Sequence, residues 1–277
     1  MPGPLVTTQW VEDHLDDPLV CVLDICDRPA YLEGHPPGAV WVGWEDHLCV
    51  TVGGIEHMAP PPAQAAAIFG AWGIKPDTTV VAMDDRMSSR SARAFWLLRL
   101  YGHQEVAIMD GARAAWLAEG RPLTTDEPAP GDGLYPVKLP DPDVNATWKE
   151  VLEGSNSGSS LLLDVRRAGE FTGAEARAKR GGHIPGAIHM PWESAMTEGG
   201  CFRSASELKD MYPTNEPVIA YCQGGVRAAH TWFVLSELLG RDNVRNYDGS
   251  WAEWGNREDL PVERGGEVYT GELPPVD

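Results

Sequence analysis

Residues 218–230 of the chain read Val-Ile-Ala-Tyr-Cys-Gln-Gly-Gly-Val-Arg-Ala-Ala-His. The first four residues are apolar and typical of a buried β-strand, and the segment from Ala228 to Leu239 is typical of a helix. The run therefore predicts a strand, a short loop and a helix, with Cys222 at the carboxyl end of the strand. Unpaired N–H groups and the positive end of the helix dipole favour an anion there, so Cys222 is a candidate reactive thiolate.

The loop itself adds to this hypothesis. Gly224 and Gly225 tolerate backbone angles that let successive N–H groups turn inward and form an anion-binding nest. Arg227 supplies a positive charge, and it either points into the site or braces the loop by pairing with a carboxylate. The alternative, an inert cysteine beside a tight turn, does not account for the two glycines and the arginine together.

Length and composition bound the class of protein. The 277 residues favour two domains, and an apolar fraction of 43% is enough for ordinary globular cores. No segment has the roughly 18 unbroken apolar residues of a membrane helix, and the first residues lack the features of a signal peptide. We therefore expect a cytoplasmic protein.

The charge excludes some partners. A net charge of −19 argues against nucleic acid and anionic membranes, and an anionic substrate would need local positive charge at its site. The five cysteines are odd in number and form no repeated Cys-x-x-Cys pair, so neither a disulfide framework nor a zinc site is indicated. Nothing in the sequence indicates a metal, nucleotide or flavin cofactor.

The sequence repeats at the scale of a domain, because the two halves share four segments in the same order. The matching pairs are 19–24 with 161–166, 34–40 with 182–188, 79–84 with 217–222, and 109–116 with 247–254. In the last pair the spacing from glycine to tryptophan is the same in both halves. We expect an N-terminal domain at residues 1–121 and a C-terminal domain at residues 146–277. Residues 122–145, rich in proline and glycine, are predicted to form an extended linker on the surface.

Within each half, short apolar runs alternate with helical stretches, for example at residues 91–100 and 206–211. This alternation predicts an α/β fold in which each domain has a mainly parallel sheet flanked by helices. Ligands of such sheets bind beyond the carboxyl ends of the strands, which is where Cys222 is predicted to lie.

Three runs together resemble the tandem-domain sulfurtransferases of the rhodanese family. They are Gly-His-Ile-Pro-Gly-Ala at 182–187, Cys-x4-Arg at 222–227 and Asp-Gly-Ser-Trp-Ala-Glu-Trp at 248–254, and the resemblance extends from about Leu5 to Val262. It implies two rhodanese-like α/β domains, of which only the C-terminal one is catalytic. In the N-terminal half Asp84 stands where Cys222 would be, so that half is expected to be structural.

The resemblance implies a two-step transfer of sulfur. Cys222 would take the outer sulfur of a small anionic donor as a persulfide and pass it to cyanide or a thiol. The loop that would hold the sulfur comprises Cys222, Gln223, Gly224, Gly225, Val226 and Arg227. Arg177 and Arg180 are candidates for binding the anionic end of the donor, and the sequence does not decide between them.

The identity of the donor stays open at this point. Relatives that use 3-mercaptopyruvate resemble Cys-Gly-Ser-Gly-Val-Thr, whereas relatives that use thiosulfate carry cationic residues directly after the cysteine. Here Gly224 stands in the place of the serine and Arg227 in the place of the threonine, which favours thiosulfate. A persulfide carrier that serves a protein partner is the non-enzymatic alternative, because it would use the same cysteine.

Two further possibilities carry less support. Phosphatases and arsenate reductases use a Cys-x5-Arg loop, and the Cys-x4-Arg loop from Cys222 to Arg227 is one residue shorter, which suits a single sulfur atom. A redox pair of Cys201 and Cys222 has no sequence motif behind it.

Overall fold

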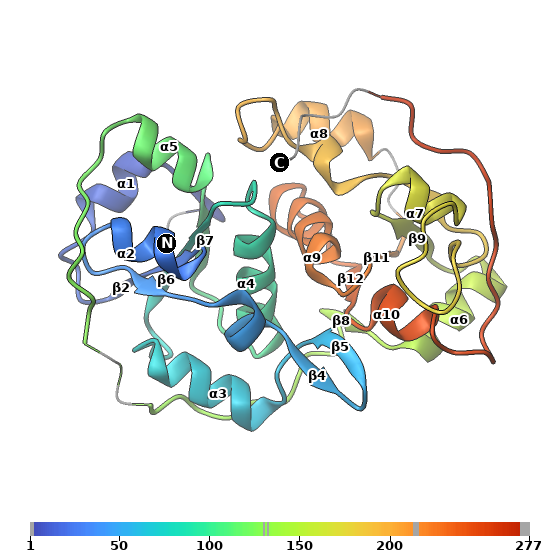
Figure 1. Ribbon diagram of the computed structural model, residues 1–277, viewed down its shortest axis with the longest axis horizontal. Helices are drawn as coiled ribbons and strands as arrows, with labels where there is room; N and C mark the ends of the chain where they lie inside the picture. Colours follow the sequence, from blue (N-terminus) through green and yellow to red (C-terminus); the bar gives the residue numbers. More distant parts are fainter. Residues whose placement is uncertain (1–2, 130, 132, 213–215, 272–277) are drawn as a thin grey trace. The chain divides into compact units, whose positions relative to one another are not determined.

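The computed structural model describes residues 3–129, 131, 133–212 and 216–271. The chain divides into two units (Figure 1). The first unit comprises residues 1–50, 59–141 and 199–202, and the second comprises residues 51–58, 142–198 and 203–277. Within the described ranges, no helix is both long enough and apolar enough to cross a bilayer.

The first unit is built on a five-stranded parallel sheet in the order β1-β7-β6-β2-β3. Its strands are β1 (Leu5–Val6), β2 (Val20–Ile25), β3 (Val40–Trp41), β6 (Thr79–Asp84) and β7 (Val106–Met109). Its helices are α1 (Thr8–Asp13), α2 (Arg28–Glu33), η1 (Trp44–Leu48), α3 (Pro62–Ala71), α4 (Ser89–Leu100) and α5 (Ala112–Ala118).

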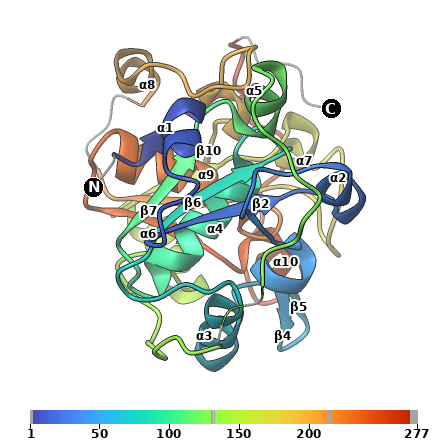
Figure 2. The ribbon, with the colours of Figure 1, turned by 90° about the vertical axis from the view of Figure 1, so that its left-hand side faces the viewer.

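Alternation along the strands of the first unit divides the core between the two faces of the sheet. Val81 and Met83 of β6 belong to a buried cluster that also contains Val11 of α1 and Trp116 of α5. Helix α4 packs against β6 and β7 and lies over the opposite face, away from α1 and α5 (Figures 1 and 2). Both faces are covered, which explains why the strands are almost continuously apolar.

The second unit repeats this plan, with strand order β8-β12-β11-β9-β10. Its strands are β8 (Asn145–Ala146), β9 (Leu161–Asp164), β10 (Ile188–His189), β11 (Val218–Tyr221) and β12 (Val244–Tyr247). Its helices are α6 (Trp148–Ser157), α7 (Ala168–Thr172), η2 (Trp192–Ala195), α8 (Ala205–Met211), α9 (Val226–Phe233), η3 (Val234–Leu238) and α10 (Ser250–Trp254). The predicted repeat and the α/β class with parallel sheets are therefore confirmed.

One hairpin departs from the order of the sequence. Strands β4 (Val50–Val52) and β5 (Ile55–Met58) are joined at Gly53 and Gly54, both of which have positive φ. Residues 51–58 of this hairpin group with the second unit, although they lie within the first repeat. The sequence did not predict that this hairpin would group with the second unit.

The predicted linker contributes mostly to the first unit, which extends to Asp141. Leu134, Val137 and Leu139 of this segment are exposed, whereas Tyr135 is buried. Residues 130 and 132 of this linker lie outside the described residues, as do residues 1–2 and 272–277 at the ends of the two predicted domains.

In the first unit, the loop between β6 and α4 is organised around the side-chain carboxyl group of Asp84. Asp84 is fully buried, and its Oδ1 accepts hydrogen bonds from the backbone N–H groups of Arg86 (2.8 Å) and Ser88 (3.0 Å). Its Oδ2 accepts a third from the N–H of Ser91 (2.7 Å). The carboxylate thus accepts hydrogen bonds from the N–H groups around the start of α4, which supports a structural role for this loop.

Replacing Asp84 with alanine is expected to destabilise the first unit by about 2–4 kcal/mol, because the buried N–H groups of Ser88 and Ser91 and the part-buried N–H of Arg86 lose their acceptor. Asp84→Asn keeps one acceptor oxygen and should cost less. Urea unfolding, with hydrogen exchange followed across residues 79–100, measures the effect. A loss below about 0.5 kcal/mol for Asp84→Ala, the size typical of unremarkable surface substitutions, would contradict this role.

Candidate active site

Cys222 lies in the four-residue loop between the end of β11 at Tyr221 and the start of α9 at Val226, as predicted. Its side chain is only 1% exposed, so the sulfur sits at the base of the loop. The Oγ of Ser250 accepts hydrogen bonds from the N–H groups of Cys222 (3.0 Å) and Gly225 (3.1 Å) and donates to the carbonyl of Tyr247 (2.7 Å). This single hydroxyl ties both ends of the loop to the end of β12.

The rest of the loop backbone is also fixed. The N–H groups of Trp251 and Ala252 donate to the carbonyls of Cys222 and Gln223. Gly225 caps α9 with φ of 72°, a left-handed conformation that favours glycine. Within the described part of the chain, nothing accepts a hydrogen bond from the N–H groups of Gln223 and Gly224. These groups and the first turn of α9 are available to an anion at Cys222.

Arg227 braces the loop, one of the two roles that the sequence left open. Its guanidinium donates two hydrogen bonds to the carboxylate of Glu170 on α7, at 2.8 and 2.9 Å. Burial opposes the charge on Arg227, but the ion pair with Glu170 and the neighbouring Cys222 sulfur outweigh it and raise the arginine's pKa. Burial likewise opposes the charge of Glu170, yet Arg227 lowers the pKa of this carboxyl to about 2. A bidentate pair of this kind fixes the start of α9 in position.

Glu193 on η2 is a second carboxyl close to this charge, and the sequence analysis missed it. It is 3% exposed, and its Oε2 has no hydrogen-bond partner among the described residues. Burial raises the pKa of Glu193, and the positive charges of Arg227 and Arg167 offset part of this rise. The site therefore places a carboxyl of increased proton affinity in the field of Arg227.

His57 from β5 covers the loop at Gly224. A Cβ atom at position 224 would lie 2.7 Å from the Cβ and 3.0 Å from the Nδ1 of His57. Both residues belong to the second unit. Only glycine fits at this position without a displacement, which gives Gly224 a packing reason in addition to its role in the loop.

The two candidate donor-binding arginines occupy different environments. The guanidinium of Arg180 donates to the backbone carbonyls of Trp254, Arg257 and Leu260, so it holds the segment after α10. The side chain of Arg177 is exposed, while its carbonyl accepts a hydrogen bond from the Nε2 of Gln223 (3.0 Å). Arg177 is therefore adjacent to the loop. The guanidinium of Arg180 is bound to backbone carbonyls, whereas that of Arg177 has no such contact among the described residues.

Several other residues of the repeated segments and of the three quoted runs make structural contacts. The Nδ1 atoms of His35 and His183 bond the carbonyls of Tyr31 and Phe171, and each histidine forms a bridge to a distant strand-like segment. Asp164 pairs with Arg166 at the end of β9. Trp251 and Trp254 are fully buried in the core cluster beside the sheet.

All five cysteines are free thiols in the described ranges, and no group of three or more histidine, cysteine and carboxylate side chains there is arranged to hold a metal ion. Burial raises the pKa of Cys21 to about 12, and the pKa values of Cys26 and Cys201 are raised for the same reason. These three thiols are therefore poor nucleophiles near neutral pH.

The fold and the loop define an α/β protein with a buried cysteine in the loop between a strand and a helix. The family model of the rhodanese-like domain matches residues 7–119 and 147–257, one match in each repeat. The chain therefore belongs to the rhodanese family, with two rhodanese domains in tandem, and the resemblance drawn from the sequence is confirmed.

Curated relatives align over nearly the whole chain. The chain is 38% identical to the sulfur carrier protein TtuD of Thermus thermophilus, covering 96% of this chain and 98% of that protein. It is 39% identical to a thiosulfate sulfurtransferase of Corynebacterium glutamicum, covering 95% and 91% respectively. Among solved structures, the 3-mercaptopyruvate sulfurtransferase SseA of Escherichia coli matches with a TM-score of 0.79 and 28% identity, covering 90% of this chain and 99% of that one.

The ion pair predicts a specific dependence of stability on pH. An unfolded glutamate titrates near pH 4.3, whereas Glu170 has a native pKa of about 2. The native state thus binds this proton less tightly, so the pair stabilises the fold fully above about pH 5 and loses its contribution as the pH falls toward about 2. The shift corresponds to a contribution on the order of 3 kcal/mol.

Glu170→Gln should therefore destabilise the protein most near neutral pH, and its difference from the wild type should narrow on acidification. Urea unfolding between about pH 3 and pH 7 measures this difference. Glu258→Gln, at an exposed position, is the control for loss of one carboxylate. A difference between Glu170→Gln and wild type that is constant across this range would show that the pair is not the source.

The close approach of His57 to Gly224 predicts that a substitution of His57 will restore activity lost by a substitution of Gly224. Gly224→Ala should reduce turnover about tenfold or more, because its Cβ displaces either the loop or His57. Adding His57→Gly removes the opposing Cβ and ring at a residue whose φ is 63°, and should restore most of the activity. Steady-state kinetics of the two single variants and the double variant test the coupling. Additive losses would contradict it.

Proposed function

We propose that the protein is a thiosulfate sulfurtransferase that carries the transferred sulfur as a persulfide on Cys222. The observation that carries this proposal is the buried Cys222 in a loop where the backbone N–H groups of Gln223 and Gly224 have no acceptor among the described residues, with the charge of Arg227 close to the sulfur. Such a loop stabilises both the attacking thiolate and the terminal sulfur of a persulfide. Family membership and the relatives named as thiosulfate sulfurtransferases support the same reaction.

The reaction balances without a cofactor. The thiolate of Cys222 attacks the outer sulfur of thiosulfate, a new S–S bond forms, and the original S–S bond breaks as sulfite departs with its electron pair. A nucleophilic acceptor, cyanide or a thiolate, then attacks the terminal sulfur of the persulfide. The Cys222 thiolate leaves and returns the site to its starting state.

The contact between Gly224 and His57 supports thiosulfate as the donor in preference to 3-mercaptopyruvate. A serine side chain at position 224 would collide with His57, so this loop has no room for the hydroxyl expected of the mercaptopyruvate-using pattern. The 28% identity to SseA keeps 3-mercaptopyruvate as the alternative donor to be measured. Arg177, exposed and adjacent to Gln223, is our choice for binding the sulfonate end of thiosulfate.

A second candidate function is transfer of the persulfide sulfur to a protein partner. It is favoured by the 38% identity to TtuD, a protein named as a sulfur carrier, over 96% of this chain. Both functions use Cys222 in the same way, and they differ in the acceptor.

Steady-state assays with thiosulfate and 3-mercaptopyruvate, each with cyanide as acceptor, test the proposed function. Turnover should favour thiosulfate and fall at least about 1,000-fold in Cys222→Ser, with Cys201→Ser as the matched control. Activity retained in Cys222→Ser would refute the mechanism. No turnover with either donor, combined with formation of a persulfide on Cys222, would favour the carrier function.

Substitutions of Arg177 and Arg180 should have different effects on the kinetics and on the stability of the protein. Arg177→Gln is expected to raise KM for thiosulfate about tenfold with a smaller effect on kcat, because it would lose a charge-assisted contact with the donor. Arg180→Gln should instead lower the free energy of unfolding, since four backbone carbonyls lose their donor. Kinetics and urea unfolding on both variants measure this. The reverse pattern would assign donor binding to Arg180.

A further inference from the structure

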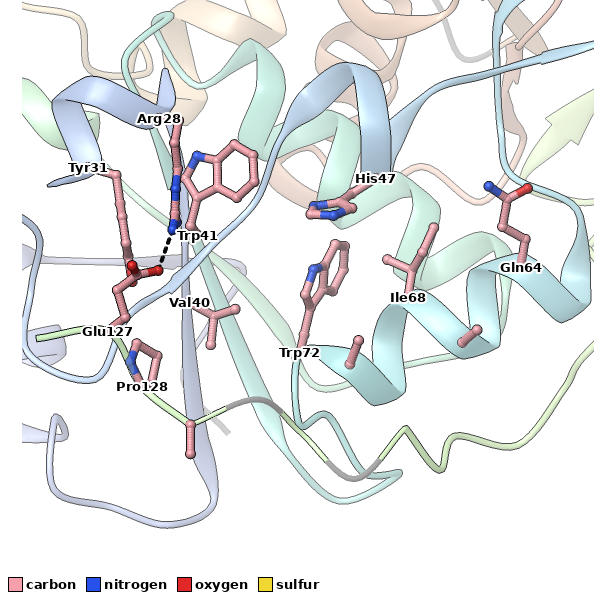
Figure 3. A pocket seen from close by; sticks show the side chains of 13 residues that line it. Arg28, Tyr31, Val40, Trp41, His47, Gln64, Ile68, Trp72, Glu127 and Pro128 are labelled. Atoms are coloured by element: carbon pink, nitrogen blue, oxygen red, sulfur yellow. Dashed lines mark hydrogen bonds and ion pairs between the residues drawn. The ribbon is translucent and has the colours of Figure 1, made fainter.

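The first unit contains a cavity that plays no part in the chemistry at Cys222. Its volume is about 510 Å³, within the range of about 300–1,000 Å³ typical of small-molecule sites. It lies beside the edge strand β3, between α3 and the segment 127–129 of the linker (Figure 3). All the residues that line it belong to the first unit.

One wall of the cavity is apolar and partly aromatic. Trp72 and Ile68 contribute large side chains from the end of α3, and Val40 contributes from β3 (Figure 3). Ala67 and Ala71 line the same side and are exposed, so short side chains on α3 leave the space open. A flat apolar group would bury itself against this wall and be released from water.

His47 adds a directed hydrogen-bond donor. Its ring lies edge-on to Trp41 and Trp72, with centroids 5.6 and 6.0 Å away. Its Nδ1 accepts the N–H of Gly43 (3.1 Å), so the neutral ring carries its proton on Nε2. Burial lowers the pKa of His47, which keeps the ring neutral near pH 7.

Arg28 supplies a cation whose plane is fixed. Its guanidinium lies over the rings of Trp41 (4.8 Å) and Tyr31 (5.3 Å) and donates one hydrogen bond to Glu127 (2.5 Å). The side chains of this ion pair are 38% and 46% exposed, so the pair is held weakly and can exchange partners. Stacking keeps the guanidinium in place while its remaining donors stay available for a carboxylate.

We propose that this cavity binds a small planar aromatic carboxylate. Its ring packs against Trp72 and Ile68, and its carboxylate takes the place of Glu127 on Arg28. The Nε2–H of His47 is available to ligands whose ring carries an acceptor atom. The aromatic wall sets the shape of the ligand, and Arg28 sets its charge. This inference does not depend on the proposed reaction at Cys222.

Isothermal titration of the full chain with 2-naphthoate tests the proposal, with 2-naphthalenemethanol as the neutral analogue and 2-naphthylmethylammonium as the cationic one. The carboxylate should bind most tightly. Arg28→Gln should weaken its binding about tenfold or more, as expected for loss of a charged hydrogen-bond donor. Glu127→Gln should tighten it several-fold, because the competing carboxylate is gone.

Filling the cavity provides a second test. Ala71→Trp places an indole in the space from an exposed position on α3 and should abolish binding. Ala63→Trp, exposed on the same helix but outside the cavity lining, is the matched control and should bind as the wild type does. Circular dichroism checks that both variants fold. Absence of 2-naphthoate binding, a preference for the ammonium analogue, or equal binding by both tryptophan variants would overturn the proposal.

Discussion

The hydroxyl of Ser250 is the contact on which the site depends. By accepting hydrogen bonds from the N–H groups of Cys222 and Gly225 together, it fixes the loop at both ends, while the N–H groups of Gln223 and Gly224 between them have no acceptor among the described residues. Ser250 itself adopts φ of 48°, an uncommon conformation for a residue other than glycine, at the first residue of α10. The parallel pairing of β11 with β12 brings the two segments to the same edge of the sheet, so the sheet positions the cysteine.

Comparison of the two units shows what separates a structural loop from a reactive one. In the first unit the carboxylate of Asp84 accepts hydrogen bonds from the N–H groups of Arg86, Ser88 and Ser91 around the start of α4. In the second unit the corresponding position is a thiol, and the charge nearby comes from Arg227 and its partner Glu170. The same backbone plan therefore holds a buried carboxyl group in one unit and a buried thiol in the other.

Much of this followed from the sequence, because strands, helix starts and the glycine loop depend on local pattern. Cys222, the repeat and the bracing option for Arg227 could be predicted in this way. His57 and Glu193 could not, because their places in the site arise from tertiary contacts: a hairpin of the first repeat that joins the second unit, and a short helix near Arg227. The hydrogen bonds of the Arg180 side chain could not be predicted from the sequence either, because the carbonyl groups that accept them are distant in the sequence.

The most direct test of the account is a single-turnover experiment with thiosulfate and no acceptor. If Cys222 takes the outer sulfur as a persulfide, each chain should release about one equivalent of sulfite and gain one sulfur atom on the peptide that contains Cys222, as seen by mass spectrometry. Release of sulfite only after an acceptor is added, or sulfur found on another cysteine, would contradict a covalent relay through Cys222.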